Sequence, residues 1–215
     1  MRVKSERMKE RDERREAGFS IIELMIAMAV TLIVMTAATT LLASSLKIRV
    51  RENQKSDALA DAQRALNIMS RDIANAGFGL DYNGIVTADS GQTAIRIRAN
   101  VLNVNSNATD GQDEDVMYVF QNSNAIVRYD PVASPTTVSL ASRINSLQLQ
   151  YYDYSYDSSG TLVTSGPNNA PTVNTGRVRI TVSVTLDAVG NQPAATVQLT
   201  SDVTLRNAPF MLGRY

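Results

Sequence analysis

The chain begins with a charged stretch and then changes abruptly to apolar residues. From Phe19 to Leu46 the sequence contains one charged residue, Glu23, and neither Pro nor Gly. A run of this length is typical of a membrane-spanning helix. At about 1.5 Å per residue, residues 19–42 form a helix of roughly 36 Å, which is longer than a hydrocarbon core of about 30 Å. The pattern therefore predicts one membrane span near the N-terminus.

The helix is expected to continue beyond this apolar run. Residues 47–76 again lack Pro and Gly, and apolar residues recur there every three or four positions. The members of this stripe are Leu59, Ala62, Leu66, Met69, Ile73 and Ala76. Such spacing places them on one face of an amphipathic helix, where they pack against a core. Because Gly77 and Gly79 supply a stop signal, the pattern predicts one helix from about Phe19 to Ala76.

After Gly79 the pattern changes to the alternation that is typical of β-strands. Strands are predicted at residues 94–98, 115–121, 125–130, 136–140, 146–154, 177–186 and 195–205. The last two alternate most clearly, which suits an antiparallel sheet with one face in water. Gly190-Asn191 between them indicates a hairpin. Two polar loops are predicted, at residues 103–112 and 155–175.

These patterns together predict an α+β fold. A long N-terminal helix, half of it transmembrane, packs against a C-terminal antiparallel β-sheet domain. The predicted organisation has four segments: a charged N-terminal segment at 1–18, a membrane helix at 19–46, an amphipathic continuation at 47–79, and a β-rich domain at 80–215.

Charge and composition narrow the function. Lys plus Arg and Asp plus Glu both total 21, so the overall charge does not point to nucleic acid as the main partner. Residues 1–18 contain seven bases, which predicts that this end lies in the cytoplasm and that the chain after Lys47 lies outside.

The chain contains no Cys and no His. A disulfide framework, a thiolate metal site and Ser-His or Cys-His triads are therefore excluded within this chain. A carboxylate-based hydrolase stays open as a hypothesis, but the sequence places no pair of carboxylates in one cleft. We expect no enzymatic activity, no cofactor and no metal.

The membrane segment has two possible interpretations. One is an ordinary uncleaved signal anchor, which would leave a single-pass membrane protein with an extracytoplasmic binding domain. However, the apolar run is about twice the length of a signal-peptide core, and Gly18 directly precedes it. Inserting a charged side chain such as that of Glu23 at the centre of a bilayer costs about 2 to 3.5 kcal/mol of free energy, and less near the interface. A carboxylate in such an unfavourable position calls for a functional explanation.

The segment Gly18-Phe19-Ser20-Ile21-Ile22-Glu23, followed by about twenty apolar residues, resembles the class III signal of type IV prepilins. The resemblance implies the type IV pilin fold and a leader peptide, residues 1–18, which prepilin peptidase removes after Gly18. It also implies methylation of the new amine of Phe19 and retention of the apolar segment in a filament. The Phe19 ammonium of one subunit and Glu23 of its neighbour would then neutralise each other, which is far less costly than burying either charge alone.

Three later segments resemble the PilW family of minor pilins, with the type II secretion pseudopilin J as a near relative. They are residues 70–79, 146–153 and 201–207. PilW-like proteins often carry cysteines in the head domain, and this chain has none. The resemblance implies a single-pass protein of the bacterial inner membrane that passes into a pilus or pseudopilus. Its implied partners are prepilin peptidase, other major and minor pilins, and the inner-membrane assembly platform.

Two further clusters have alternative interpretations. Asp110, Asp113, Glu114 and Asp115 could hold calcium, but their spacing does not match an EF-hand, and a solvated turn is the preferred interpretation. Tyr151, Tyr152, Tyr154 and Tyr156 could form an adhesive surface, with Tyr151 on the face opposite to the other three. Ordinary sheet packing is the preferred interpretation.

Four arginines also lie in alternating pairs on two predicted strands. They are Arg96 and Arg98 on one strand, and Arg177 and Arg179 on the other. If the two strands were neighbours, the arginines could contact phosphates. Solvated strand faces explain them adequately, and we do not expect nucleic acid to be a partner.

Overall fold

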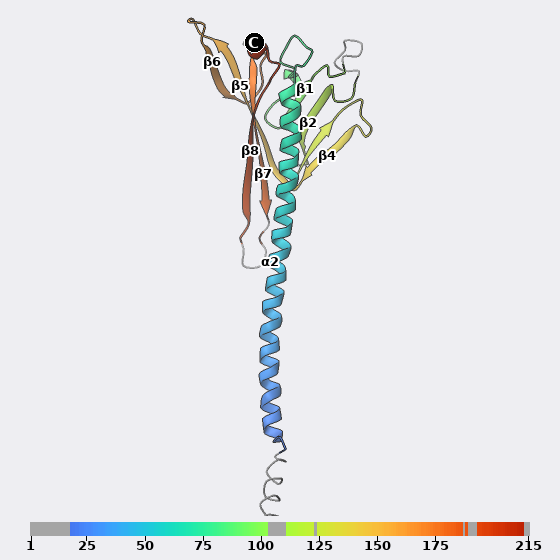
Figure 1. Ribbon diagram of the computed structural model, residues 1–215, viewed down its shortest axis with the longest axis vertical. Coiled ribbons are helices and arrows are strands. Elements are labelled where there is room, and N and C mark those ends of the chain that lie inside the picture. The colour runs from blue at the N-terminus through green and yellow to red at the C-terminus, as the bar shows by residue number, and fades with distance from the viewer. Residues whose placement is uncertain (1–17, 103–110, 123, 187, 189–192, 213–215) are drawn as a thin grey trace, which may run out of the picture. The chain divides into compact units, whose positions relative to one another are not determined.

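The computed structural model describes residues 18–102, 111–122, 124–186, 188 and 193–212 (Figure 1). The chain forms two compact units, Met1–Val50 and Arg51–Tyr215. A long helix precedes a domain of antiparallel strands. The predicted α+β class is confirmed, and the architecture is consistent with the type IV pilin fold.

The long helix, α2, spans Ile21–Asn75, close to the predicted range. It begins two residues later than predicted and ends one residue earlier. Gly77 follows with a φ of +79°, in the left-handed region that glycine adopts without strain. A Cβ at Gly77 would also lie 2.7 Å from the carbonyl oxygen of Tyr82. The predicted glycine stop therefore has both a conformational and a steric basis.

The second half of α2 buries one face within the Arg51–Tyr215 unit. Five of the six stripe residues are buried, but Leu59 is only half-buried. Ala58 and Ala65, which the prediction omitted, are buried instead. The packed face is thus rotated slightly toward small residues, whose short side chains allow close packing.

The strands form two four-stranded antiparallel sheets, a division that alternation alone does not reveal. The first sheet has the order β1-β2-β3-β4, with β1 at Ala94–Arg98, β2 at Asp115–Gln121, β3 at Ala125–Tyr129 and β4 at Thr137–Ser142. The second has the order β6-β5-β7-β8, with β5 at Ile144–Tyr156, β6 at Leu162–Asn168, β7 at Thr175–Leu186 and β8 at Ala195–Thr204. Seven of these strands match predicted ones within two residues at each end.

The prediction of a structureless loop at 155–175 is wrong, because β6 lies within it. This strand contains Gly166 and Pro167 and lacks alternation, and most of its side chains are exposed. Proline is tolerated there because β6 is an edge strand. The short elements η2 (Thr87–Asp89) and α3 (Pro209–Leu212) were also not predicted.

Two predicted connections fall partly or wholly outside the described residues. They are most of the loop at 103–112 and the Gly190-Asn191 turn. The strands that this turn joins, β7 and β8, pair antiparallel from Arg177 with Thr204 to Leu186 with Ala195. The hairpin pairing is therefore confirmed, although its turn is not described.

One hydrophobic core unites the end of α2 with both sheets. Its fully buried members include Met69 and Ile73 from α2, Tyr118 and Ile126 from the first sheet, and Leu149 and Ile180 from the second. At about 1.5 to 3 kcal/mol for each large apolar side chain, this burial is the main stabilising contribution to the domain. In Figure 1 the sheets flank this part of the helix.

Candidate functional site

The predicted site residues lie at the start of α2 and just before it. Gly18, Phe19 and Ser20 precede the helix, and Phe19 is 83% exposed. A Cβ at Gly18 would meet no atom within 4 Å. Nothing in the described part of the chain therefore requires glycine at this position.

Ser20 caps the N-terminus of α2, a role that the sequence analysis missed. The amide of Leu24 donates to the Ser20 carbonyl over 3.1 Å, which forms the first helical hydrogen bond. The amide of Ile22 donates to Ser20 Oγ over 3.4 Å. Serine is a preferred N-cap residue because its oxygen satisfies an amide that has no helical acceptor. The spacing Ser-x-x-Glu, from Ser20 to Glu23, is the sequence signal that could have revealed it.

Glu23 lies in the first turn of α2 and is exposed. Its negative charge is favourable there, because the helix dipole is positive at the N-terminus. Among the described residues, Glu23 has no ion-pair or hydrogen-bond partner. The structure thus places Phe19 just before α2 and Glu23 in its first turn, with the Glu23 carboxylate exposed and unpaired within the described residues.

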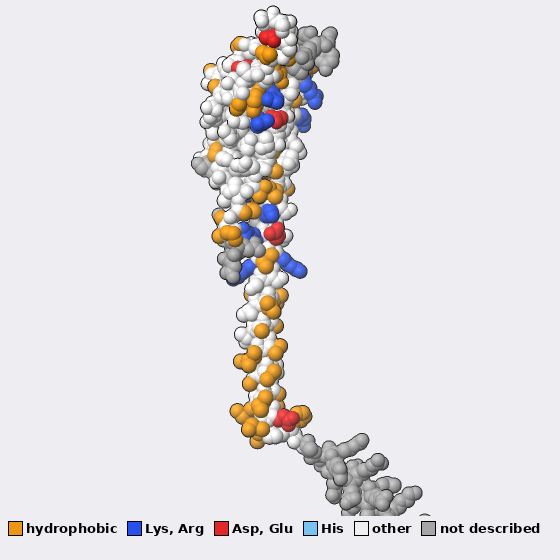
Figure 2. Space-filling view, turned by 90° about the vertical axis from the view of Figure 1, so that its left-hand side faces the viewer, with side chains coloured by type: hydrophobic (Ala, Val, Ile, Leu, Met, Phe, Trp, Pro, Cys, Tyr) orange, Lys and Arg blue, Asp and Glu red, His pale blue; other side chains and the backbone are white. Residues whose placement is uncertain are grey.

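The apolar half of α2 presents its side chains outward. The most apolar stretch has no buried residue, and it meets the length and composition requirements for crossing a membrane. Figure 2 shows hydrophobic side chains distributed along this bare part of the helix. These features fit membrane anchoring.

Hydroxyl groups within this segment are satisfied by the helix itself. Thr31 Oγ1 donates to the Ala27 carbonyl over 2.7 Å, and Ser44 Oγ donates to the Thr40 carbonyl over 2.9 Å. Thr36, Thr39 and Thr40 donate in the same way to carbonyls of the preceding turn. Because these five hydroxyls have internal acceptors, they are compatible with a lipid environment.

The interpretation of the acidic cluster as a solvated turn is wrong for two of its members. Glu114 is fully buried, and its carboxylate accepts the amides of Leu102 and Gly111 over 2.9 and 2.8 Å. Asp115 is 3% exposed, whereas Asp113 is exposed and pairs with Arg128. Within the described residues, no group of acidic side chains is arranged to hold a metal ion. Asp110 lies outside the described residues.

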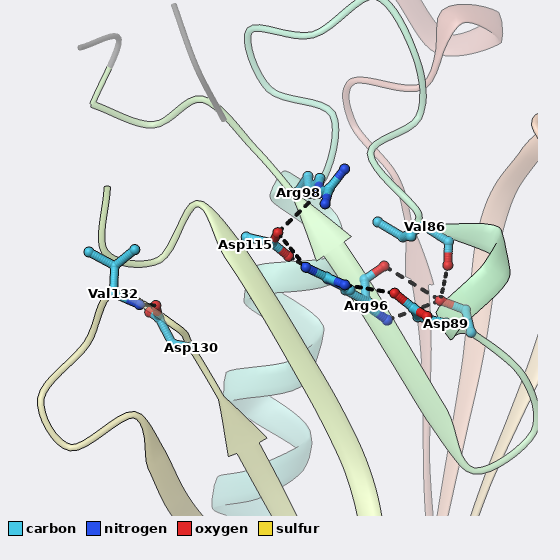
Figure 3. A network of polar contacts seen from close by, with 8 residues as sticks. Val86, Asp89, Arg96, Arg98, Asp115, Asp130 and Val132 are labelled. Carbon is cyan, nitrogen blue, oxygen red and sulfur yellow. Dashed lines mark hydrogen bonds and ion pairs between the residues drawn. The ribbon is translucent and has the colours of Figure 1, made fainter. Parts of the chain in front are cut away.

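Asp115 joins the two arginines of β1 in an ion-pair network (Figure 3). Arg96 Nε and Nη2 donate to the two carboxylate oxygens of Asp115 over 2.7 and 2.8 Å, and Arg98 Nε donates over 3.1 Å. Arg96 Nη1 also donates to Asp89 over 2.7 Å. Burial opposes ionisation of Asp115, but the Arg96 hydrogen bond and the Arg98 charge outweigh it and hold the pKa of Asp115 below its usual value. These groups stabilise the domain.

The two arginine pairs do not form one surface on neighbouring strands. β1 and β7 belong to different sheets, so the condition for a shared phosphate-binding face is not met. Arg179 pairs with Asp202 over 2.9 Å. Arg177 lies over the Tyr152 ring, 3.9 Å from its centroid, in a cation–π contact.

The tyrosines of β5 differ in their exposure. Tyr151 and Tyr152 are both buried, and the register shifts between Tyr152 and Asp153. Tyr151 Oη donates to the Gly91 carbonyl over 2.7 Å, and burial raises the pKa of Tyr151. Tyr156 is exposed, and its ring lies 5.8 Å from that of Phe210. Sheet packing accounts for Tyr151 and Tyr152.

A surface pocket of about 180 Å³ lies beside the end of α2. Its charged lining residues are Arg71, Asp72, Arg98 and Asp113. Each of them is engaged in an ion pair: Arg71 with Asp72, Arg98 with Asp115, and Asp113 with Arg128. The pocket therefore presents paired charges, which gives it no evident catalytic group.

Comparison with known proteins identifies one feature. Residues 14–39 match the family model of the prokaryotic N-terminal methylation motif. The match covers Gly18, Phe19, Glu23 and much of the apolar run, and it supports a type IV pilin-like precursor that is membrane associated. No curated protein and no solved structure matches the chain.

Proposed function

We propose that this chain is the precursor of a minor pilin, cut after Gly18 and methylated at the amine of Phe19. The methylation motif at residues 14–39 is the observation that carries the proposal. The structure adds support, since Gly18 and Phe19 lie outside α2 and are exposed. A peptidase must bind the substrate backbone in an accessible form, and α2 begins only at Ile21.

Glu23 is the proposed assembly residue. Cleavage creates an ammonium group on Phe19, and Glu23 of a neighbouring subunit supplies the opposite charge. A charged pair transferred together into a low-dielectric helix bundle costs much less than a single buried charge. The carboxylate of Glu23 is exposed and unpaired within the described residues, which leaves it available for this contact.

The proposed topology follows from the flanks of the apolar segment. Residues 1–18, the leader, lie in the cytoplasm, and residues 19–46 span the inner membrane. Residues 47–79 contain the rest of the helix, which ends at Asn75, and residues 80–215 form the extracytoplasmic head. Prepilin peptidase, other pilins and the inner-membrane assembly platform are the proposed partners. The head then contacts sibling subunits through its surface.

Within the pilin-like proteins we propose a PilW-type minor pilin that primes or caps a type IV pilus, with a pseudopilin J role as the alternative. A strain that lacks this chain distinguishes the two. Loss of surface pili with intact protein secretion supports the pilus role, and the opposite result supports the secretion role.

The experiment that tests processing is intact-mass analysis of the full chain expressed with and without prepilin peptidase. We expect a mature chain that begins at methylated Phe19 only when the peptidase is present. Gly18→Phe should block cleavage, although no described atom would clash with the new side chain within the subunit. Gly18→Ala serves as the matched variant with a minimal change. A chain that keeps residues 1–18 in the presence of active peptidase would refute the proposal.

A further inference from the structure

Two basic side chains, Lys47 and Arg49, directly follow the apolar segment of α2. Both are exposed, and among the described residues neither has an ion-pair or hydrogen-bond partner. The next basic residue differs. Arg51 is only 8% exposed, and its Nη2 donates to the Pro193 carbonyl over 2.5 Å. Arg51 thus serves the head domain, whereas Lys47 and Arg49 leave their charges exposed and open to a partner outside the described chain.

Helix geometry places Lys47 and Arg49 on opposite sides of α2. Successive residues turn by about 100° and rise by about 1.5 Å, so two positions apart they differ by about 200° and roughly 3 Å. The two cations therefore form a collar at one level of the helix. A single flat protein surface cannot contact both, but a lipid annulus surrounds the helix on all sides.

The level of this collar matches a headgroup layer. Glu23 and Lys47 are separated by 24 positions, which corresponds to about 36 Å along the helix. A tilt of about 20° reduces this span to roughly 34 Å. The hydrocarbon core is about 30 Å thick, and the bilayer with its headgroups is about 40 to 45 Å thick. When Glu23 lies at one interface, Lys47 and Arg49 lie among the headgroups of the other.

We propose that Lys47 and Arg49 bind the phosphate groups of anionic phospholipids in the outer layer of the inner membrane, before assembly. Long basic side chains at a helix end extend to the interface, where phosphate offers the complementary charge. The contact sets the depth of the unassembled subunit and must break when the subunit leaves the membrane. This inference relies on the proposed function only for the orientation of the chain.

The test measures lipid selectivity with the full-length, uncleaved chain in phosphatidylcholine bilayers. Spin-labelled phosphatidylglycerol or phosphatidylcholine is added, and electron paramagnetic resonance gives the fraction of each lipid held at the protein surface. The relative association constant of phosphatidylglycerol should fall at least about twofold in the Lys47→Ala/Arg49→Ala variant. One cation near the surface increases the affinity for an anionic lipid by about fivefold. The expected fall is smaller than this because only some of the lipid sites around the helix adjoin a cation.

A matched control removes the same charge from α2 within the head unit, as Lys55→Ala/Arg64→Ala, where Lys55 is half-buried and Arg64 is exposed. The control should keep the wild-type selectivity, and Lys47→Arg/Arg49→Lys should keep it as well. The leader is identical in all variants, so its own bases contribute equally. Unchanged selectivity in the double alanine variant, or an equal fall in the control, would overturn the inference. No peptidase or partner subunit takes part in this measurement, so its outcome is independent of cleavage and assembly. A failure of cleavage or assembly would instead contradict the proposed function.

Discussion

The side-chain amide of Asn207 donates to the carbonyl oxygen of Asn75 over 3.2 Å, across 132 positions of the chain. The same amide donates to the Ala76 carbonyl over 3.3 Å, and the backbone amide of Arg206 donates to the Ala74 carbonyl over 3.0 Å. The last carbonyl groups of a helix find no N–H donor within the helix, so they need donors from elsewhere. The segment after β8 supplies those donors and ties the end of α2 to the end of the sheet.

Replacing Asn207 should therefore destabilise the head. Asn207→Ala should lower the free energy of unfolding by about 1 kcal/mol, and Asn207→Asp by more, because a carboxylate would face two carbonyl oxygens. Urea denaturation of residues 51–215 measures the change. Asn169→Ala, at an exposed position, is the control and should unfold like the wild type. Equal midpoints for Asn207→Asp and the wild type would contradict this role.

Gly84 should tolerate no side chain. Its φ is +77°, and a Cβ would lie 2.0 Å from the amide nitrogen of Gly77 and 2.5 Å from the Arg98 carbonyl oxygen. Gly160 has nearly the same φ, +78°, but open space around it. Gly160→Ala should cost about 1 kcal/mol from backbone strain alone, whereas Gly84→Ala should cost at least about 3 kcal/mol or prevent folding. Similar thermal unfolding of the two variants would show that the close approach at Gly84 is absent.

The elements of this fold were largely predictable, because the 3.6-residue and two-residue periods are local properties of the chain. The two failures have different causes. β6 carries no alternation, since an exposed edge strand does not need an apolar face, and the division into two sheets depends on contacts between distant strands.

The candidate site, like the fold, was only partly predictable from the sequence. The segment from Gly18 to Glu23 is a contiguous signal, so it can be proposed from the sequence alone, and the methylation motif at residues 14–39 includes it. The burial of Glu114 and the pairing of Asp115 with Arg96 arise from tertiary packing. Nothing in the local spacing of these acids distinguishes such residues from a solvated turn.

The Asp115 network predicts a pH-dependent stability. Because the folded-state pKa of Asp115 lies below its usual value, its ionised form stabilises the domain at pH values above about 4. This contribution is lost as the pH falls through the folded-state pKa. Asp115→Asn should cost about 2 kcal/mol at pH 7, and the difference from the wild type should shrink below about pH 4. Urea denaturation at several pH values measures it. A constant difference down to about pH 2.5 would contradict the linkage.

A comparison at neutral pH separates this network from general charge effects. Asp57→Asn removes a carboxylate from an exposed position of α2 and should leave the unfolding midpoint at pH 7 unchanged. If both variants lost the same stability, the loss would reflect net charge rather than the contacts of Asp115 with Arg96 and Arg98.

Ser20 should control the first turn of α2. Ser20→Ala removes the acceptor of the Ile22 amide and should reduce the local stability by about 1 kcal/mol. Amide hydrogen exchange of Ile22, measured by NMR on the full chain in micelles, should accelerate about fivefold. Ser20→Asp should restore protection because aspartate also caps helices. Ser44→Ala, which removes a hydroxyl from the helix interior, is the control. Unaltered exchange in Ser20→Ala would exclude the cap.

Glu23→Gln is the sharpest test of the proposed assembly contact, because it removes the charge and keeps the size of the side chain. Cleavage should proceed as in the wild type, since Gly18 and Phe19 lie before the helix and Glu23 lies within it. Incorporation into filaments should fall at least about tenfold, because an unpaired Phe19 ammonium in a low-dielectric core costs several kcal/mol. Quantitative immunoblotting of sheared filaments, normalised to processed subunit in the membrane, measures both steps. Glu23→Asp retains the charge and should recover part of the incorporation; equal incorporation of Glu23→Gln and the wild type would eliminate charge pairing as the basis of assembly.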